Sequence, residues 1–219
     1  MTKEKMLKKI ILVSLVVTSA VFAQINVGAR AAANFGSSWG EDAKGATWGL
    51  GFNAGVAAKV DILPLITIVS GLEVDYRRMG AEENYSDDYN KFYRKQTQSL
   101  WYFDVPVLAR FNIIPLVHVD AGFLFSLNLS SDMHYEETVT SIKTGHSENV
   151  ADDLDYSKIT NTFDFGLAVG VGFSVLPSVL DVDFRIILGL NSYMKEDDEG
   201  YDTTERHLRM QLGATFWFL

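Results

Sequence analysis

The stretch from Thr47 to Asp61 reads TWGLGFNAGVAAKVD and alternates between two kinds of residue. Successive side chains of a β-strand point to opposite faces, so each kind occupies one surface of a predicted strand. One face carries Trp48, Leu50, Phe52, Ala54, Val56, Ala58 and Val60, and the other carries Gly49, Gly51, Asn53, Gly55, Ala57, Lys59 and Asp61. The apolar face is too bulky to fill a small barrel, whereas glycine suits a crowded interior. The stretch therefore predicts a strand whose apolar face points outward, which is stable only in lipid.

The same alternation recurs in eight segments along the 219-residue chain. Each segment reaches the ~9–11 residues that a membrane-spanning strand needs, and eight is an even number at the lower limit for single-chain membrane barrels. The predicted fold class is all-β, an eight-stranded antiparallel up-and-down transmembrane β-barrel. The segments cover about 24–35, 47–61, 65–77, 98–113, 116–129, 160–176, 179–190 and 207–219.

The predicted connections alternate between short turns and long loops, which is typical of membrane barrels with the long loops outside the cell. The short turns lie at Leu63-Pro64, Ile114-Pro115 and Leu176-Pro177-Ser178, and the long loops at about 36–46, 78–97, 130–159 and 191–206. The fourth proline, Pro106, falls within a predicted strand. Because proline has no N–H to donate, we expect a bulge or a local break in pairing there.

The N-terminal segment predicts export. Four lysines precede an apolar run from Ile10 to Phe22 that is too short for a spanning helix, and small residues follow it. We therefore expect a signal peptide at 1–23 and the barrel at 24–219. The chain has no cysteine, which excludes disulfides and a lipid-modified cysteine. Its formal charge of −9 would become more negative on cleavage and argues against nucleic acid as a partner.

The inward face of the predicted strands carries charges of both signs. Buried charges persist only when they are paired and hydrogen-bonded, so we expect an ion-pair network that plugs the barrel. The alternative is a conduction path for small ions. The predicted lumen network is Arg30, Lys59, Glu73, Asp75, Arg77, Asp104, Arg110, Asp120, Asp164, Asp183, Arg185 and Arg209, with Asp61 and Asp181 on the same face.

One pair of residues on the inward face invites a catalytic interpretation. His118 and Asp120 lie two residues apart, but Ser126 of the same strand lies ~26 Å from His118 along the strand. The sequence leaves open a serine from a neighbouring strand. We expect instead that His118 fills the short-turn end of the lumen and bonds a carboxylate, and that the protein is not an enzyme and has no cofactor.

The predicted long loops are acidic and one of them is aromatic. Clustered carboxylates could hold Ca²⁺ or Mg²⁺ that bridges to lipopolysaccharide phosphates, but none has the spacing of an EF-hand, and solvated loop charge is the simpler interpretation. The aromatics could form a belt, extend the strands past the membrane or contact a partner. The acidic residues are Glu82, Glu83, Asp87, Asp88, Asp152, Asp153, Asp155, Glu196, Asp197, Asp198 and Glu199, and the aromatics are Tyr85, Tyr89, Phe92 and Tyr93.

Residues 101–111, WYFDVPVLARF, resemble the mid-barrel motif of the PorT-like outer-membrane β-barrel family. Residues 119–123, 163–167 and 170–173 resemble later strands of that family, and the general pattern is shared with OmpX-like eight-stranded proteins. The resemblance implies an outer-membrane location in a Gram-negative bacterium, but not a single activity, since members include secretion accessories. The motif, which we expect to be structural, comprises Tyr102, Asp104, Pro106, Leu108 and Arg110.

The C-terminus departs from the usual signal of such barrels. Outer-membrane barrels commonly end on an aromatic residue read by the assembly machinery, whereas this chain ends Phe216-Trp217-Phe218-Leu219, with the aromatic residue penultimate. The expected partners are outer-membrane lipid and lipopolysaccharide, the barrel-assembly machinery, and a protein partner through the long loops. The expected function is non-enzymatic: envelope structure, surface interaction or assistance to a secretion system. A narrow pore, a lipid-modifying enzyme and a secreted lipocalin-like carrier are the alternatives, in that order.

Overall fold

The computed structural model describes residues 25–195 and 204–218, which form nine strands. The predicted signal peptide 1–23 and the acidic run Glu196–Glu199 lie outside these residues. No helix in the described part of the chain is long and apolar enough to cross a membrane. The strands are β1 (Ile25–Trp39), β2 (Ala46–Leu63), β3 (Ile66–Ser86), β4 (Asn90–Ile114), β5 (Val117–Ser141), β6 (Ser147–Asp155), β7 (Phe163–Leu176), β8 (Leu180–Gly189) and β9 (Arg206–Phe218).

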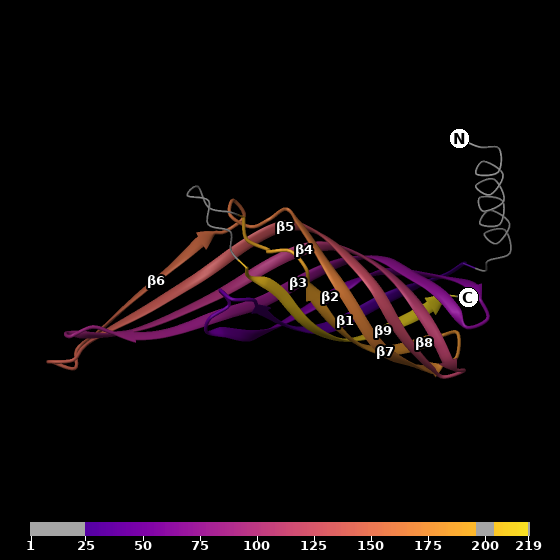
Figure 1. Cartoon of the computed structure of the whole chain (residues 1–219), viewed down its shortest axis with the longest axis horizontal. Helices are drawn as coiled ribbons and strands as arrows, with labels where there is room; N and C mark the ends of the chain where they lie inside the picture. The colour runs from indigo at the N-terminus through magenta and orange to yellow at the C-terminus, as the bar shows by residue number, and fades with distance from the viewer. Residues whose placement is uncertain (1–24, 196–203, 219) are drawn as a thin grey trace, which may run out of the picture.

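Eight of these strands close an antiparallel barrel (Figure 1). The order around the ring is β1, β2, β3, β4, β5, β7, β8 and β9, and β9 returns to β1 in a ladder from Val27↔Phe218 to Trp39↔Arg206. The predicted eight-stranded up-and-down barrel is therefore confirmed. The ninth strand, β6, stands outside the ring, and among the described strands it pairs only with the far half of β5.

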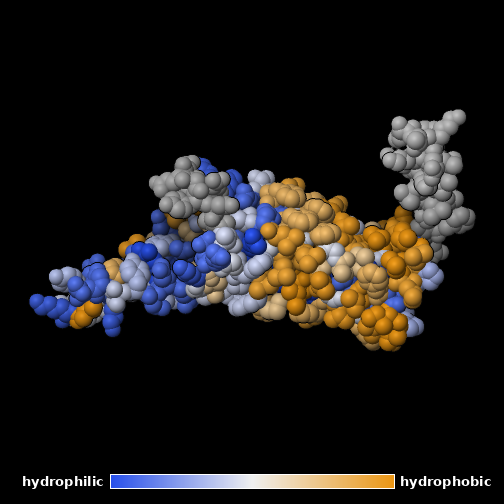
Figure 2. All heavy atoms as spheres, in the orientation of Figure 1, coloured by the Kyte–Doolittle hydropathy of each residue, from blue (hydrophilic) through white to orange (hydrophobic). Residues whose placement is uncertain are grey.

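The faces of the strands are arranged as the alternation predicts. Phe52 and Ile186 expose 51% and 42% of their surface on the outside, whereas Arg77 is fully buried at 0%. Figure 2 shows the apolar surface over the half of the molecule that holds the short turns, and a hydrophilic surface over the half that projects beyond it. The apolar half has the band of outward residues that a bilayer solvates.

Strands β3, β4 and β5 are much longer than the sequence predicts. Segments 78–97 and 130–159 were expected to be loops, and this prediction is wrong: residues 78–86, 90–97 and 130–141 continue the strands, and β6 joins them. Beyond the membrane these strands are polar on both faces, so the apolar alternation behind the prediction disappears. We call residues 78–97, 130–141 and β6 the blade, which projects to the left in Figure 1.

The β2–β3 and β3–β4 ladders both contain irregularities. The β3–β4 register continues from Ser70↔Val107 to Glu73↔Asp104 without the two pairs between them, so the expected break in pairing lies at Pro106. A register shift in the β2–β3 ladder lies between Trp48 and Phe52, where β2 carries one residue more than β3. A bulge of this kind dents the surface and increases the local twist.

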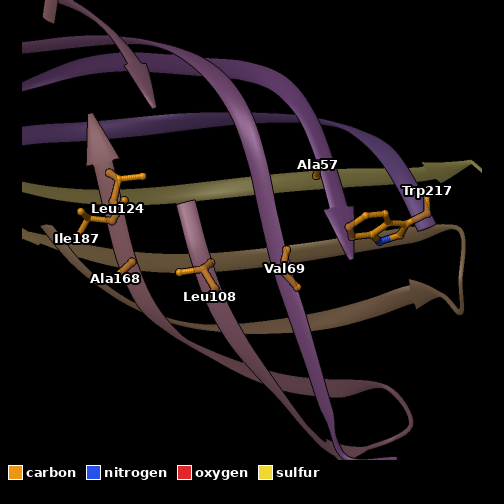
Figure 3. Close-up of a cluster of buried hydrophobic side chains, with 7 residues drawn as sticks. All are labelled: Ala57, Val69, Leu108, Leu124, Ala168, Ile187 and Trp217. Atoms are coloured by element: carbon orange, nitrogen blue, oxygen red, sulfur yellow. The ribbon is translucent and has the colours of Figure 1, made fainter. Parts of the chain in front are cut away.

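Apolar side chains fill the space that the charged residues leave inside the barrel. Figure 3 shows seven of them on seven different strands of the ring. They form one buried cluster, so the inward face is not restricted to glycine and polar residues. The cluster consists of Ala57, Val69, Leu108, Leu124, Ala168, Ile187 and Trp217.

Candidate functional site

The lumen of the barrel buries a set of twelve charged residues. Eleven of the twelve residues predicted for the lumen network belong to it, Asp181 is the twelfth, and the remaining predicted residue, Lys59, is half-buried. Carboxylates outnumber guanidinium groups by seven to five. The set is Arg30, Arg77, Arg110, Arg185 and Arg209 with Glu73, Asp75, Asp104, Asp120, Asp164, Asp181 and Asp183.

Arg77 is the centre of the cluster closer to the blade. Its Nε donates to Asp75 Oδ2 at 2.8 Å and its Nη2 to Asp104 Oδ1 at 2.8 Å. Its Nη1 donates to Asp164 Oδ2 at 2.7 Å, and Nη2 also reaches Ser126 Oγ at 2.7 Å. One guanidinium group on β3 thus links β4, β5 and β7 across the lumen, and charge-assisted bonds of this kind are the strong ones.

Two further residues complete this Arg77 cluster. Arg209 of β9 pairs with Asp75 and lies 3.4 Å from Asp104 Oδ2. The ring of Tyr102 lies 3.7 Å from the Arg77 guanidinium carbon, which is cation–π distance. Both arginines of the Arg77 cluster therefore contact a carboxylate, and Arg77 also contacts an aromatic ring.

A second cluster, centred on Arg30, lies closer to the short turns. Arg30 Nη2 donates to Asp183 Oδ1 at 3.0 Å, and its Nε lies 3.3 Å from Glu73 Oε1. Arg185 lies 3.0 Å from Asp183 Oδ1 and 3.5 Å from Asp120 Oδ2. These contacts join β1, β3, β5 and β8 by buried charge.

Arg110 extends the Arg30 cluster to the end of the barrel. Its Nε donates to Asp120 Oδ1 at 2.9 Å, and its Nη1 to Asp181 Oδ2 at 2.6 Å. Trp217 Nε1 donates to the same Asp181 oxygen at 2.8 Å. Lys59 Nζ lies 4.2 Å from the centre of the Trp217 ring, so the half-buried lysine covers the apolar face of the tryptophan.

Two glycines supply the space that large inward side chains occupy. A Cβ at Gly213 would lie 2.5 Å from Arg30 Nη2, and a Cβ at Gly172 would collide with the ring of His118. The inward glycines noted in the sequence therefore allow a guanidinium group and an imidazole to lie close against a neighbouring strand.

The catalytic interpretation of His118 finds no support in the geometry. Asp120 is held by Arg110, and Ser126 Oγ accepts a hydrogen bond from Arg77. His118 is buried as expected, but its Nε2 has no hydrogen-bond partner among the described residues, so the expected bond to a carboxylate is not formed. Within the described ranges, no group of three or more His, Asp or Glu residues is arranged to hold a metal ion.

His207 of β9 was not singled out from the sequence, although alternation places it on the face of Arg209. Its Nδ1 lies 2.8 Å from Asp164 Oδ2, and its ring stacks on Tyr193 at 4.5 Å. Tyr193 belongs to the connection between β8 and β9 and donates from its hydroxyl to Glu205 at 2.5 Å. Burial raises the pKa of Glu205, which lies just before β9. These residues close the blade end of the lumen above the Arg77 cluster.

The motif of residues 101–111 contributes four inward side chains and the proline. Tyr102, Asp104, Leu108 and Arg110 are all buried, and they belong to the two charge clusters or the apolar cluster. Pro106 marks the gap in the β3–β4 ladder. The alternating half of the motif is therefore built into the packing of the lumen.

Comparison with known proteins identifies a family. The sequence model of the family described as "Outer membrane protein beta-barrel domain" matches residues 21–195. No curated protein matches the chain.

Solved outer-membrane proteins resemble the chain at low identity. The attachment invasion locus protein Ail of Yersinia pestis is 11% identical, with 88% of this chain and 98% of that chain covered and a TM-score of 0.38. Neisserial surface protein A is 13% identical, with 88% and 97% covered and a TM-score of 0.42. CarO2 of Acinetobacter baumannii is 14% identical, with 89% and 100% covered and a TM-score of 0.40.

Proposed function

We propose that this chain, which belongs to the outer membrane protein beta-barrel domain family, is a non-enzymatic surface-interaction protein. The protein is located in the outer membrane, where the apolar band of the barrel contacts lipid. In the proposal the barrel is the anchor, and the blade is the part that meets a partner outside the cell. The narrower assignment to the PorT-like family rests on residues 101–111, and the likeness to OmpX-like proteins rests on the general strand pattern; both belong to the same proposal.

The observation that carries this proposal is the open edge of β6. All nine residues of β6 are exposed, and the strand pairs on one side with β5, from Asp132↔Asp155 to Thr140↔Ser147. On the other side, no strand among the described residues pairs with it. An unpaired strand edge presents a row of N–H and C=O groups to which another extended chain can add.

The charge of the blade indicates which class of partner would bind the open edge of β6. Glu148, Asp152, Asp153 and Asp155 lie along β6, so the open edge is acidic. Two copies of this edge would repel each other, since like charges placed opposite each other destabilise a strand pair. The edge therefore suits an extended segment rich in lysine or arginine rather than a second copy of the same chain.

The lumen supports the role of an anchor rather than a pore. An eight-stranded barrel is just wide enough for its own side chains to fill it. Here twelve buried charged residues, the apolar cluster and the Tyr193–Glu205 contact occupy that space. We infer that the lumen is plugged and that a narrow pore is the less favoured function.

The test uses the folded protein in detergent and an extended basic peptide with alternating lysine and valine. The chemical shifts of the β6 amides should change on titration and those of β8 should not. A variant with Glu148, Asp152, Asp153 and Asp155 changed to Gln or Asn should bind at least about tenfold more weakly. A matched peptide with alternate backbone nitrogens methylated should not bind, because it cannot complete the ladder. Equal binding of the methylated peptide would exclude strand addition.

A further inference from the structure

A cavity of about 320 Å³ lies at the junction of the barrel and the blade, where the β2–β3 ladder shifts register. Three residues of β2 between Trp48 and Phe52 are opposite two residues of β3 there. This bulge bends β2 locally and leaves a hollow on the surface. The side chains of interest in its lining are two cations, one carboxylate, a threonine and two large apolar groups. They are Arg78, Lys95, Glu82, Thr97, Trp48 and Leu50.

The cavity lies at the level where the apolar band ends. Phe52, Tyr76 and Trp101 form an aromatic cluster on the outer face, with ring centroids 4.9 to 5.8 Å apart. Aromatic residues gather at the interfaces of membrane barrels. Arg78 is the next residue after Tyr76 on the same face of β3, ~7 Å further from the membrane. Its guanidinium group therefore lies at headgroup level, on the side of the blade.

The two cations of this cavity outnumber its one carboxylate. Neither Arg78 nor Lys95 forms an ion pair among the described residues, whereas the nearby Arg94 is held by Glu137 at 2.6 Å. Glu82 is the one carboxylate in the lining, and it is opposite Lys95 in the β3–β4 register. The cavity thus keeps a net positive charge beside exposed apolar surface.

We propose that this cavity binds a phosphate group of lipopolysaccharide in the outer leaflet. Arg78 presents the planar fork that matches phosphate oxygens, and Lys95 adds a second charge that can approach from the other strand. Trp48 and Leu50 expose 51% and 60% of their surface beside them, which suits the acyl chains of a phosphorylated glycolipid and not a free phosphate ion. We call Arg78, Lys95, Trp48 and Leu50 the Arg78 site.

The site is independent of the open edge of β6, because it lies on the outer face of β2–β4, while the one described strand that pairs with β6 is β5. Bound lipopolysaccharide would fix the height of the barrel in the membrane and the position at which the blade emerges. Loss of this binding would leave the proposed strand addition at β6 intact, so each proposal can fail without the other.

The test measures binding of purified lipopolysaccharide to the refolded protein in detergent by calorimetry. The double variant Arg78→Gln/Lys95→Gln should bind about tenfold more weakly, since two charge-assisted contacts are removed. The control is Lys91→Gln, on the same face of β4 but ~13 Å further from the membrane, and it should bind like the unchanged protein. Heat-modifiable gel mobility establishes that each variant is folded.

Two further ligands identify the source of the phosphate. Phosphatase-treated lipopolysaccharide should bind the unchanged protein as weakly as intact lipopolysaccharide binds the double variant. Inorganic phosphate at an equal phosphate concentration should not displace the lipid. The proposal is overturned if the double variant and Lys91→Gln bind alike, if the dephosphorylated lipid binds at full strength, or if inorganic phosphate displaces the lipid.

Discussion

The guanidinium group of Arg30 on β1 occupies the volume that a side chain at Gly213 on β9 would need. An added Cβ at residue 213 would lie 2.5 Å from Arg30 Nη2, and the same nitrogen donates to Asp183 at 3.0 Å. The two residues belong to the strands that close the barrel. The absence of a side chain at Gly213, near the C-terminus, therefore leaves the space in which Arg30, near the N-terminus, forms its buried ion pair with Asp183.

Gly213→Ala should destabilise the barrel by about 1–3 kcal/mol, the usual cost of overpacking a filled interior. The added methyl group must displace Arg30 from Asp183, because the adjoining strand cannot move away. Unfolding in urea from lipid vesicles measures the loss. Ala214→Val is the control, since Ala214 is the next residue on β9 and faces lipid. Equal stability of the two variants would show that Arg30 can relocate freely.

Arg77→Leu should cost about 3–5 kcal/mol, because it leaves Asp75, Asp104 and Asp164 buried without their shared cation. The matched surface change is Arg94→Leu, which breaks the blade ion pair with Glu137. That pair is partly exposed to water and should contribute little to stability. Urea titrations of both variants in the same lipid give the comparison, and similar midpoints would contradict the central role assigned to Arg77.

Val169→Arg should cost about 2–4 kcal/mol, the penalty for arginine on the lipid face near the bilayer midplane. Val169 of β7 is opposite Ile186 of β8, and both are exposed on the apolar band. Ser147→Arg on β6 should leave the unfolding free energy almost unchanged, because β6 lies in water. If both variants fold equally well in lipid, the assignment of the outer face is wrong.

The β5–β6 pair should loosen as the pH rises. A hydrogen bond to Asp153, and a second to Glu136, raise the pKa of His134 above its usual value. A histidine with a raised folded-state pKa stabilises fully below its unfolded pKa, and this stabilisation is lost as the pH rises through the folded pKa. The rate of amide hydrogen exchange in β6, corrected for intrinsic rates, should therefore increase as the pH rises from the unfolded-state pKa of His134 through its folded-state pKa. His134→Gln should abolish the dependence; an unaltered pH profile in this variant would contradict the assignment.

The unchanged protein should show no stepwise conductance in planar bilayers, because buried side chains fill its lumen. The double variant Arg77→Ala/Asp104→Ala removes one cation and one carboxylate and should open small, frequent current steps. Steps of the same size from the unchanged protein would favour the narrow pore. Arg94→Ala in the blade, outside the lumen, serves as the control.

The barrel could be predicted from the sequence because lipid requires every strand to have an apolar outer face. Phe52 and Asn53 are neighbours in the chain but belong to lipid and lumen, and this contrast repeats from strand to strand. The blade could not be predicted because water solvates both of its faces, which removes the apolar alternation. The sequence therefore places Tyr85 and Phe92 in a loop. They are in fact opposite each other on β3 and β4, with their rings stacked at 4.5 Å. Of the three alternatives for these aromatics, extension of the strands is confirmed for Tyr85, Phe92 and Tyr93, whereas Tyr89 lies in the turn between β3 and β4.

The contacts within the lumen could be predicted only by residue type. Alternation places Arg77 and Asp164 on the inward face, but they are 87 residues apart, and which carboxylate meets which guanidinium depends on the stagger of the closed ring. His207 could have been found by the same alternation, since it is two residues before Arg209. Tyr193 could not, because it lies in a connection without periodicity.

The long sequence separation of the lumen ion pairs constrains how the molecule is made. Arg30 pairs with Asp183, which lies 153 residues later in the chain, and Arg209 pairs with Asp75, which lies much earlier. A chain that threaded into hydrocarbon one strand at a time would drag bare charges through it, at a cost of several kcal/mol each. Closing the ring at the water–lipid boundary before insertion avoids this cost, so we expect the strands to enter the membrane together rather than one at a time.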